Sequence, residues 1–487
     1  MNPRTPIVAV AALLAACATT PAAPPRAERA TALDAAQAAH LERMVGAFVA
    51  AEGHPSLVVA VVRGGEPIWE AGFGEGAGRE PDADTVFRAG SITKVVTAAA
   101  LLRLVDEGVL SLDDEVARWL PEVRERLSPP GKEPVRLRHL LAHASGLPPS
   151  GYPGLDTLSG VGLTEADVFA SLEGVKFLFE PGTNHAYSNM NFVLAGLVVA
   201  RASGMPYRDF VQKNVLEPLG MRASTWDPPA HGLAPGHLVS ARGGYERSFS
   251  SPRLGILEPA GGLFTSARDL GRLAAYGLGH LELLTAETFG ESMRRQSPTT
   301  GPFGFGLGWL LLDDPDLGEV VWHNGSTQDY GAFLALHRPS DLAVVVLGGT
   351  GALGDVDEMQ SLGLAILAHL VVREAGRMPR PSRTPETVVE AVGAKLLQLT
   401  TAPTREVLET AFAPSWFDAI PLEQSLRFFE QIARESGGCT SYELVEDRGR
   451  GIFALHLRCA RGNAAARVTV EVGSPYRIAG LYLTPAP

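Results

Sequence analysis

A proline- and arginine-rich segment at residues 377–386 divides the chain into two unequal parts. It contains three prolines and three arginines. Proline lacks a backbone donor and interrupts both helices and sheets, so we expect a linker here. Residues 33–376 are long enough for one large domain, and residues 387–487 have the size of a small one. The chain of 487 residues is therefore expected to form two domains.

The overall composition excludes several classes of protein. Hydrophobic residues make up 45% of the chain and charged residues 20%, which allows packed cores and excludes global disorder. The formal net charge of −12 is unfavourable for neutralising phosphates, so we expect no nucleic-acid partner. Three cysteines are too few for a disulfide scaffold or an all-cysteine zinc site. We expect neither a metal nor a cofactor.

Residues 1–17 have the pattern of a bacterial lipoprotein signal. The apolar run at residues 7–16 is too short to span a bilayer as a helix. It ends in Leu14-Ala15-Ala16-Cys17, which resembles a lipobox, and residues 18–32 have the composition of a flexible tether. We expect export, with a lipid on Cys17 as the only membrane attachment, facing the periplasm or the exterior. The alternative is an ordinary signal peptide with a coincidental cysteine.

Hydrophobic periodicity indicates mixed α and β structure in both domains. In the large domain, Leu33–Ala51 has helical spacing, and Leu57–Val62 and Ile68–Gly72 flank a turn as in a hairpin. In the small domain, Pro385–Glu435 is helical in pattern. Four strand-like segments follow it: Tyr442–Glu446, Ile452–Leu457, Ala465–Val472 and Arg477–Leu483. This order predicts a small α+β domain.

Two cysteines flank the first hairpin of that small domain. A hairpin centred on Gly449 would place Cys439 directly opposite Cys459, because both lie ten positions from the centre. Side chains opposite each other on paired strands are close enough to need little adjustment for a disulfide. In an oxidising envelope we expect this bond, with two free thiols as the alternative.

Lysine is rare in this chain, with five residues, and one of them has a serine three positions before it. Ser91 precedes Lys94 at the start of a predicted helix, Val95–Glu107, so both side chains lie on one face a turn apart. Backbone N–H groups at a helix N-terminus favour an oxyanion near Ser91, and burial would ease deprotonation of Lys94. A serine cap followed by a surface lysine would look the same.

Other catalytic patterns are missing or incomplete. No serine has glycine at both −2 and +2, so the nucleophile turn of α/β-hydrolases is absent. His139 and His143 have the spacing of a metal site but lack the glutamate of a zinc protease helix. We therefore expect these two histidines to be buried, hydrogen-bonded or solvated rather than metal ligands.

Two further segments give Ser91 and Lys94 a context. Tyr187-Ser188-Asn189 and His323-Asn324-Gly325 follow them in order. Together, Ser-x-x-Lys, Tyr-x-Asn and His-x-Gly resemble the serine β-lactamase and penicillin-binding-protein superfamily, on its class C, DD-peptidase and esterase side. The resemblance covers roughly residues 35–372. It implies an α/β (α+β) fold, with an antiparallel sheet flanked by helices and an all-α subdomain.

The resemblance also implies catalytic roles. Ser91 would be the nucleophile that forms an acyl-enzyme, and Tyr187 the general base, with its pKa lowered by the Lys94 cation. Asn189 would hold Lys94 and the substrate amide by hydrogen bonds. Residues 323–326 contribute His323, Gly325 and Ser326 to substrate binding, and the N–H groups of Ser326 and Ser91 would form the oxyanion hole.

His323 departs from the pattern of the β-lactamases proper, which mostly carry lysine there. A histidine is a weaker fixed charge, which favours the peptidase or esterase branches over antibiotic hydrolysis. We therefore expect a serine hydrolase acting on amide or ester bonds of a small molecule or a cell-wall peptide. The alternative is a penicillin-binding or sensor protein of the same fold that does not turn over. The small domain resembles nuclear-transport-factor-like modules and shows no catalytic pattern.

Overall fold

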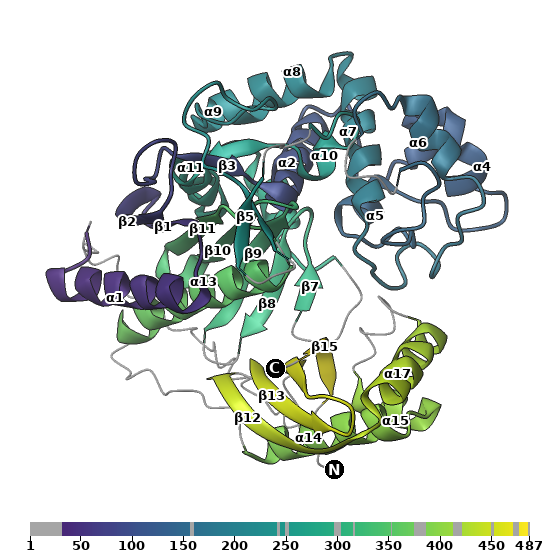
Figure 1. The fold of residues 1–487 in the computed structure, drawn as a ribbon. Coiled ribbons are helices and arrows are strands. Elements are labelled where there is room, and N and C mark those ends of the chain that lie inside the picture. Colours follow the sequence, from purple (N-terminus) through teal and green to yellow (C-terminus); the bar gives the residue numbers. More distant parts are fainter. Residues whose placement is uncertain are drawn as a thin grey trace, which may run out of the picture.

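The large domain is built on one antiparallel sheet of seven strands (Figure 1). The computed structural model describes residues 32–485 apart from 156–159, 241–243, 249–252, 297–302, 315–316, 352, 375–385, 413–420, 450–451 and 471–476. The strands lie in the order β2 (Glu66–Gly74), β1 (Ser56–Arg63), β11 (Leu342–Gly348), β10 (Gly331–His337), β9 (Gly318–Ser326), β8 (Leu310–Asp314) and β7 (Phe303–Phe305).

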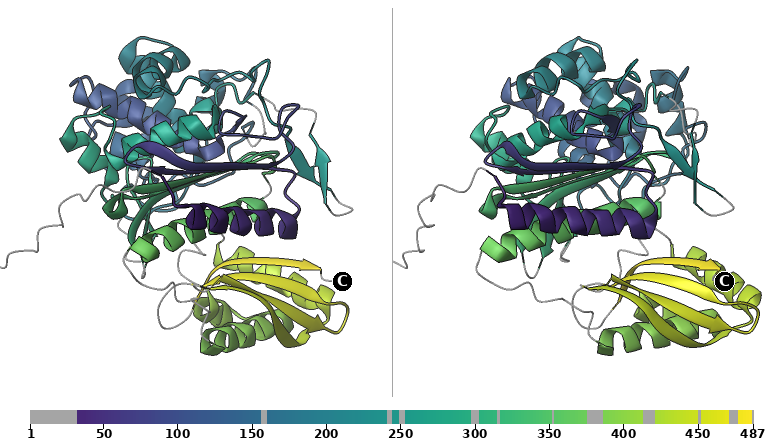
Figure 2. Two further views of the ribbon diagram at one scale, coloured as in Figure 1. Left: turned by 90° about the vertical axis from the view of Figure 1, so that its left-hand side faces the viewer. Right: turned by 60° about the vertical axis from the view of Figure 1, so that its left-hand side comes forward.

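Helices cover both faces of this sheet, as the edge-on views show (Figure 2). Helices α1 (Ala35–Glu52) and α13 (Leu353–Glu374) cover one face, and α11 (Ala267–Leu278) packs on the other. Strand β1, next to the edge strand β2, alternates accordingly. Val59 and Val61 join the core beneath α1 and α13, whereas Val58 and Val62 join the core on the opposite face. Burial on both faces explains why this strand is apolar throughout.

A helical subdomain packs against the α11 side of the sheet (Figure 2). Its central helices are α2 (Thr93–Asp106) and α7 (Asn189–Ser203), which contact each other and are buried along most of their length. Shorter helices surround them: α3 (Val116–Trp119), α4 (Arg124–Leu127), α5 (Leu137–Leu141), α6 (Glu165–Ser171), α8 (Tyr207–Val211), α9 (Glu217–Leu219), α10 (Glu258–Gly261) and α12 (Ala286–Met293). Two small two-stranded sheets pair β3 (Val86–Arg88) with β6 (Phe264–Ser266), and β4 (His237–Val239) with β5 (Tyr245–Arg247).

The small domain has helices followed by strands, as the sequence predicts. Its four antiparallel strands are β12 (Cys439–Gly449), β13 (Ile452–Cys459), β14 (Ala464–Val470) and β15 (Ile478–Pro485). Helices α14 (Glu386–Thr401), α15 (Arg405–Ala411) and α17 (Leu422–Ser436) share a core with this sheet. Arg467 of β14 reaches the large domain, where it forms an ion pair with Glu358 of α13 at 2.5 Å.

The predicted fold class of the large domain is confirmed, and some details differ from expectation. The sequence indicated strands at Leu57–Val62 and Ile68–Gly72, which are β1 and β2, but β10 at the centre of the sheet was not predicted. Within the described ranges, no helix is long and apolar enough to cross a membrane. Cys17 and nearly all of the tether and of the expected linker lie outside the described residues.

The structure contains a bond between Cys439 and Cys459, although the hairpin is not centred on Gly449. Gly449 pairs with Ile452, so the turn lies one to two residues further along the chain. Three register shifts in β12 then bring the two cysteines opposite each other. The expected pairing therefore arises from a different register near the turn.

Candidate active site

Ser91 lies in a tight turn between β3 and α2. The turn is a 3₁₀ segment, Gly90–Ile92, that continues directly into α2. Thr93 Oγ1 donates to the Gly90 carbonyl at 2.7 Å, and the Leu263 N–H donates to the same Thr93 oxygen at 3.2 Å. Gly90 has a φ of 50°, and a Cβ there would lie 2.6 Å from the backbone nitrogen of Ser326. Glycine is therefore needed to hold the serine turn against β9.

Lys94 lies one helical turn after Ser91 and is completely buried. Its Nζ lies 2.9 Å from Ser91 Oγ and donates to the carbonyl of Ala260 in α10 at 2.6 Å. Among the described residues, no carboxylate forms an ion pair with it. Burial holds the pKa of Lys94 well below its usual range, so the neutral amine is favoured near Ser91.

Tyr187 completes the group around the serine. Its ring lies beneath Lys94 Nζ, which is 4.9 Å from the ring centroid, and its hydroxyl interacts with Ser91. Burial raises the pKa of Tyr187 above its ordinary value, although the bond to Ser91 partly opposes this. This corrects the expectation that the Lys94 cation lowers the tyrosine pKa, because a buried amine that favours its neutral form supplies little charge.

His143 supports Tyr187 from behind. The two rings stack with centroids 4.2 Å apart. His143 Nδ1 accepts the backbone N–H of Ser188 at 3.1 Å, and His143 has a left-handed φ of 54°. Burial holds the pKa of His143 well below its usual range, which keeps the ring neutral. Sequence reasoning excluded His143 as a metal ligand but missed this contact.

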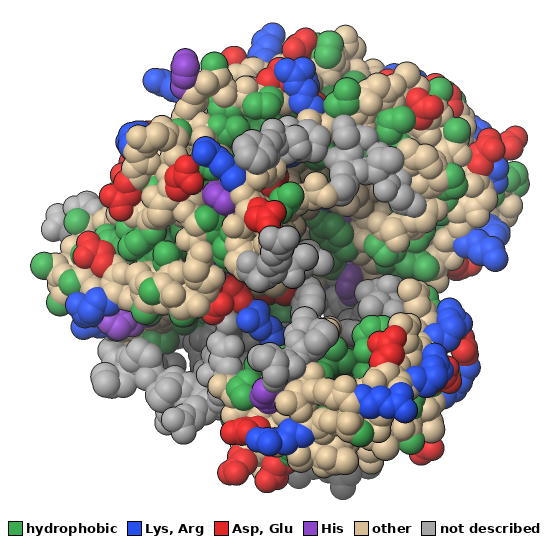
Figure 3. Space-filling model, viewed as in Figure 1, with side chains coloured by type: hydrophobic (Ala, Val, Ile, Leu, Met, Phe, Trp, Pro, Cys, Tyr) green, Lys and Arg blue, Asp and Glu red, His purple; other side chains and the backbone are tan. Residues whose placement is uncertain are grey.

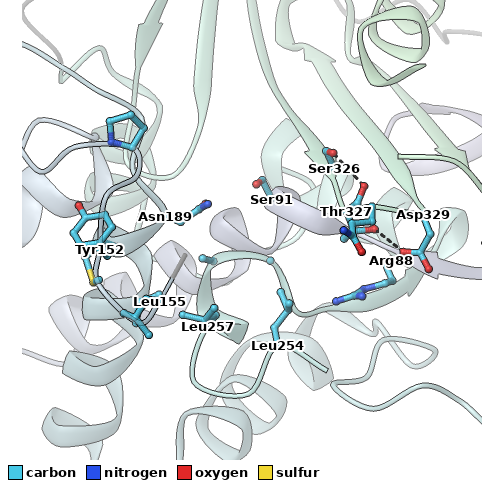
Figure 4. A pocket seen from close by; sticks show the side chains of 16 residues that line it. Arg88, Ser91, Tyr152, Leu155, Asn189, Leu254, Leu257, Ser326, Thr327 and Asp329 are labelled. Carbon is cyan, nitrogen blue, oxygen red and sulfur yellow. Dashed lines mark hydrogen bonds between the residues drawn. The ribbon is translucent and has the colours of Figure 1, made fainter. Parts of the chain in front are cut away.

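Asn189 and His323, two of the expected binding residues, take different positions at the site. In the described structure Asn189 makes no hydrogen bond to Lys94; the Ala260 carbonyl is the second partner of the amine instead. Asn189 lines the cavity beside Ser91 (Figure 4). His323 is 2% exposed, is not among the cavity-lining residues, and lies next to Tyr187 with ring centroids 6.4 Å apart. His323 therefore lies beside Tyr187 and not at the surface of the cavity.

Gly325 brings the end of β9 against the serine turn. A Cβ on Gly325 would lie 1.9 Å from the carbonyl oxygen of Ala89 and 3.0 Å from the backbone nitrogen of Ser91. The residue thus acts by allowing close approach rather than by touching substrate. Ser326 follows it and lines the cavity together with Ser91. This packing brings together the two segments whose N–H groups are the expected oxyanion-hole donors.

Ser91 opens into a cavity of about 320 Å³ (Figure 4). Figure 3 shows a recess with hydrophobic walls between the helical subdomain and the sheet. Apolar side chains line one part of the cavity, among them Tyr152, Leu155, Met190, Val193, Leu254 and Leu257. Polar residues line the other part: Arg88, Ser326, Thr327, Gln328 and Asp329. No group of three or more potential metal ligands occurs in the part of the chain that the structure describes.

Comparisons with known proteins agree with this geometry. The Beta-lactamase family profile matches residues 41–361, more than half of the chain. Esterase EstB from Burkholderia gladioli is 33% identical over 369 residues, covering 64% of this chain and 88% of the esterase. A D-stereospecific amidohydrolase from Streptomyces sp. superimposes with a TM-score of 0.56 at 27% identity, over 67% of this chain and 98% of that one.

A solved structure extends the likeness of fold further along the chain. The octameric penicillin-binding protein homologue from Pyrococcus abyssi superimposes with a TM-score of 0.64 at 22% identity. The match covers 90% of this chain and 91% of the other. The family profile and the esterase relative show that this chain belongs to the β-lactamase family of serine hydrolases, and the solved structure shows the same β-lactamase/transpeptidase fold.

Proposed function

We propose that Ser91 forms an acyl-enzyme with ester or amide substrates, which water then hydrolyses. The observation that carries the proposal is the 2.9 Å contact between Ser91 Oγ and the buried amine of Lys94. An unactivated serine is a weak nucleophile, and a neutral amine within hydrogen-bond reach is a general base. The cavity next to Ser91 provides space for the substrate.

The contacts support one sequence of proton transfers. Lys94 takes the Ser91 proton as the serine oxygen attacks the carbonyl, and the backbone N–H groups of Ser91 and Ser326 face the oxyanion. Tyr187 stays neutral because its pKa is raised, so it can donate its proton to the departing oxygen or nitrogen. The tyrosinate then recovers a proton from protonated Lys94. Deacylation reverses these transfers, with water as the nucleophile.

The environment of His323 favours esters and amides over β-lactams. Burial lowers the pKa of His323 to about 3, so the ring is neutral at physiological pH. A neutral ring is a poor substitute for the lysine that binds a β-lactam carboxylate in β-lactamases. A curated relative is an esterase and a structural neighbour is a D-stereospecific amidohydrolase, so we include D-amino-acid amides and cell-wall peptides.

A fluorophosphonate probe tests the nucleophile. We expect labelling that maps to Ser91 and disappears in Ser91→Ala, together with turnover of p-nitrophenyl esters or D-amino-acid amides and slow turnover of nitrocefin. Labelling at another residue would contradict the mechanism. Labelling by fluorescent penicillin at one probe per chain, without turnover of any substrate in the panel, would favour the sensor alternative.

We propose that this hydrolase acts at the bacterial envelope, anchored by a lipid on Cys17. The support is the Leu14-Ala15-Ala16-Cys17 sequence after an apolar run. Metabolic labelling with palmitate should modify the wild type and not Cys17→Ser, and the variant should leave the membrane fraction. An unlabelled wild type would favour an ordinary signal peptide.

A further inference from the structure

A buried arginine lines the cavity three residues before the proposed nucleophile. Arg88 is 2% exposed, and its Nε and Nη2 atoms have no hydrogen-bond partner among the described residues. The side chain is one of the cavity-lining residues and extends toward Leu254, on the side where Thr327 and Asp329 lie (Figure 4). Buried guanidinium donors are normally satisfied, so two buried and unpaired N–H groups on a residue that lines a cavity need an explanation.

The surroundings of Arg88 maintain its charge without occupying those donors. The guanidinium carbon lies over the Phe264 ring, 5.3 Å from its centroid. Asp329 raises the pKa of Arg88 and partly offsets the lowering by burial, and no ion pair within 4 Å of Arg88 occurs in the described chain. Glu258, the other nearby carboxylate, is already bound by Arg208 at 2.7 Å. Arg88 is therefore a cation with unused donor capacity.

We propose that Arg88 is a specificity residue that binds a carboxylate carried by the substrate. A carboxylate can accept two parallel N–H groups of a guanidinium, and such a bond gains strength where water is excluded. Arg88 and Ser91 are three positions apart in the chain, so their Cα atoms lie within about 11 Å of each other. A short acyl chain or an aryl leaving group can span that separation. The proposal rests on Ser91 being the acylated residue.

This assignment gives the two parts of the cavity different tasks. Leu155, Leu254 and Leu257 supply apolar contact for the body of the substrate, and Arg88 would fix the position of its charged end. Because His323 is neutral, it does not provide a cation for a substrate carboxylate. Arg88, which lies in β3 and not in β9, can provide that cation. A neutral analogue would leave the buried N–H groups unpaired and should be discriminated against.

Two matched substrate pairs test the proposal. Mono-p-nitrophenyl adipate is compared with p-nitrophenyl hexanoate for the acyl side, and p-carboxyphenyl butyrate with p-carbamoylphenyl butyrate for the leaving-group side. For each pair we take the ratio of kcat/KM for the charged member to kcat/KM for the neutral member. In one pair, this ratio should be about tenfold or more higher for the wild type than for Arg88→Met. Arg88→Lys should retain part of the preference, and Arg118→Met, at an exposed arginine, all of it.

Taking ratios separates recognition from structural damage. Equal losses for the charged and neutral members of both pairs would overturn the proposal, because Arg88 would then only support the fold. Calorimetric binding of adipate to Ser91→Ala, and its loss in Ser91→Ala with Arg88→Met, provides a readout without turnover. Absence of acylation at Ser91 would refute the proposed function, whereas binding of adipate that does not depend on Arg88 would refute this inference.

Discussion

Lys94 donates a hydrogen bond to the backbone carbonyl of Ala260 across 2.6 Å. A carbonyl carries no net charge, so this bond orients the amine without holding it protonated as a carboxylate would. The α10 segment that supplies the carbonyl is itself fixed to α2, because Thr97 Oγ1 donates to the Pro259 carbonyl at 2.7 Å. The lysine is thus directed at Ser91 in its basic form.

The first prediction concerns the pH dependence set by Lys94. Catalysis needs the neutral amine, so kcat/KM should fall as pH drops through the lowered pKa of Lys94 and should be retained at neutral pH. Lys94→Arg, which stays protonated, should lose about 10²- to 10⁴-fold at every pH. Ester hydrolysis followed from pH 4 to 10 checks this. Activity that appears only near pH 10 would show that the pKa of Lys94 is not lowered, which would contradict this prediction.

The same burial predicts a stability slope. The pKa of Lys94 is lower in the folded than in the unfolded chain, so between those values the unfolded chain binds the additional proton. The free energy of unfolding of the wild type should therefore rise with pH over this window. Lys94→Met should lack that contribution. Denaturant titrations of both proteins from pH 7 to 10 measure the difference, and parallel curves would contradict the burial argument.

The second prediction concerns the close approach at Gly325. A Cβ there would lie 1.9 Å from the Ala89 carbonyl oxygen, so Gly325→Ala must push β9 away from the serine turn. We expect a loss of about 10²- to 10³-fold in kcat, as when an oxyanion donor is removed. Gly290→Ala is the control, because open space surrounds that helical glycine. Equal activity of the two variants would contradict the proposed oxyanion hole.

The features that depend on a local pattern of residues could be predicted from the sequence. Ser91 and Lys94 are one helical turn apart, so their contact follows from α-helical geometry once the helix is recognised. Strand β1 was recognisable from its run of β-branched residues, whereas β10 at the centre of the sheet was not predicted. Tyr187 could be grouped with them only through the family resemblance, because no spacing rule connects residues that lie about a hundred positions apart.

The rest of the site depends on tertiary contacts that leave little trace in the sequence. The Ala260 carbonyl is a backbone atom, and any residue at that position would offer one. The neutral state of Lys94 follows from complete burial, which cannot be read from a lone lysine. The cysteine pairing shows the same limit, because three register shifts restore a pairing that a regular hairpin with the observed turn would miss.

The third prediction concerns His143 as a positioning residue for Tyr187. His143→Asn should be tolerated at the left-handed φ of 54° but removes the ring stacked on Tyr187. An aromatic pair contributes about 0.5–1.5 kcal/mol, so kcat should fall by up to about tenfold. Because His143 is already neutral, the pH profile should keep its shape. His231→Asn, at an exposed histidine, is the control.

A shifted pH profile in His143→Asn would mean that His143 takes part in proton transfer, which contradicts a positioning role. An unchanged kcat would mean that the stack does not orient Tyr187. Both outcomes are read from the same set of rate measurements, so the variant separates the two roles without further substitutions.

The last prediction concerns the bond between Cys439 and Cys459, which are separated by 20 positions. Closing a loop of this length restricts the unfolded chain, so replacing both cysteines by serine should destabilise the small domain by about 3 kcal/mol. Ester hydrolysis should persist, because all residues of the proposed site lie in the large domain. Thermal unfolding with and without reductant measures the loss, with Cys17→Ser as the control. Two free thiols at 439 and 459 in unreduced protein would contradict the bond.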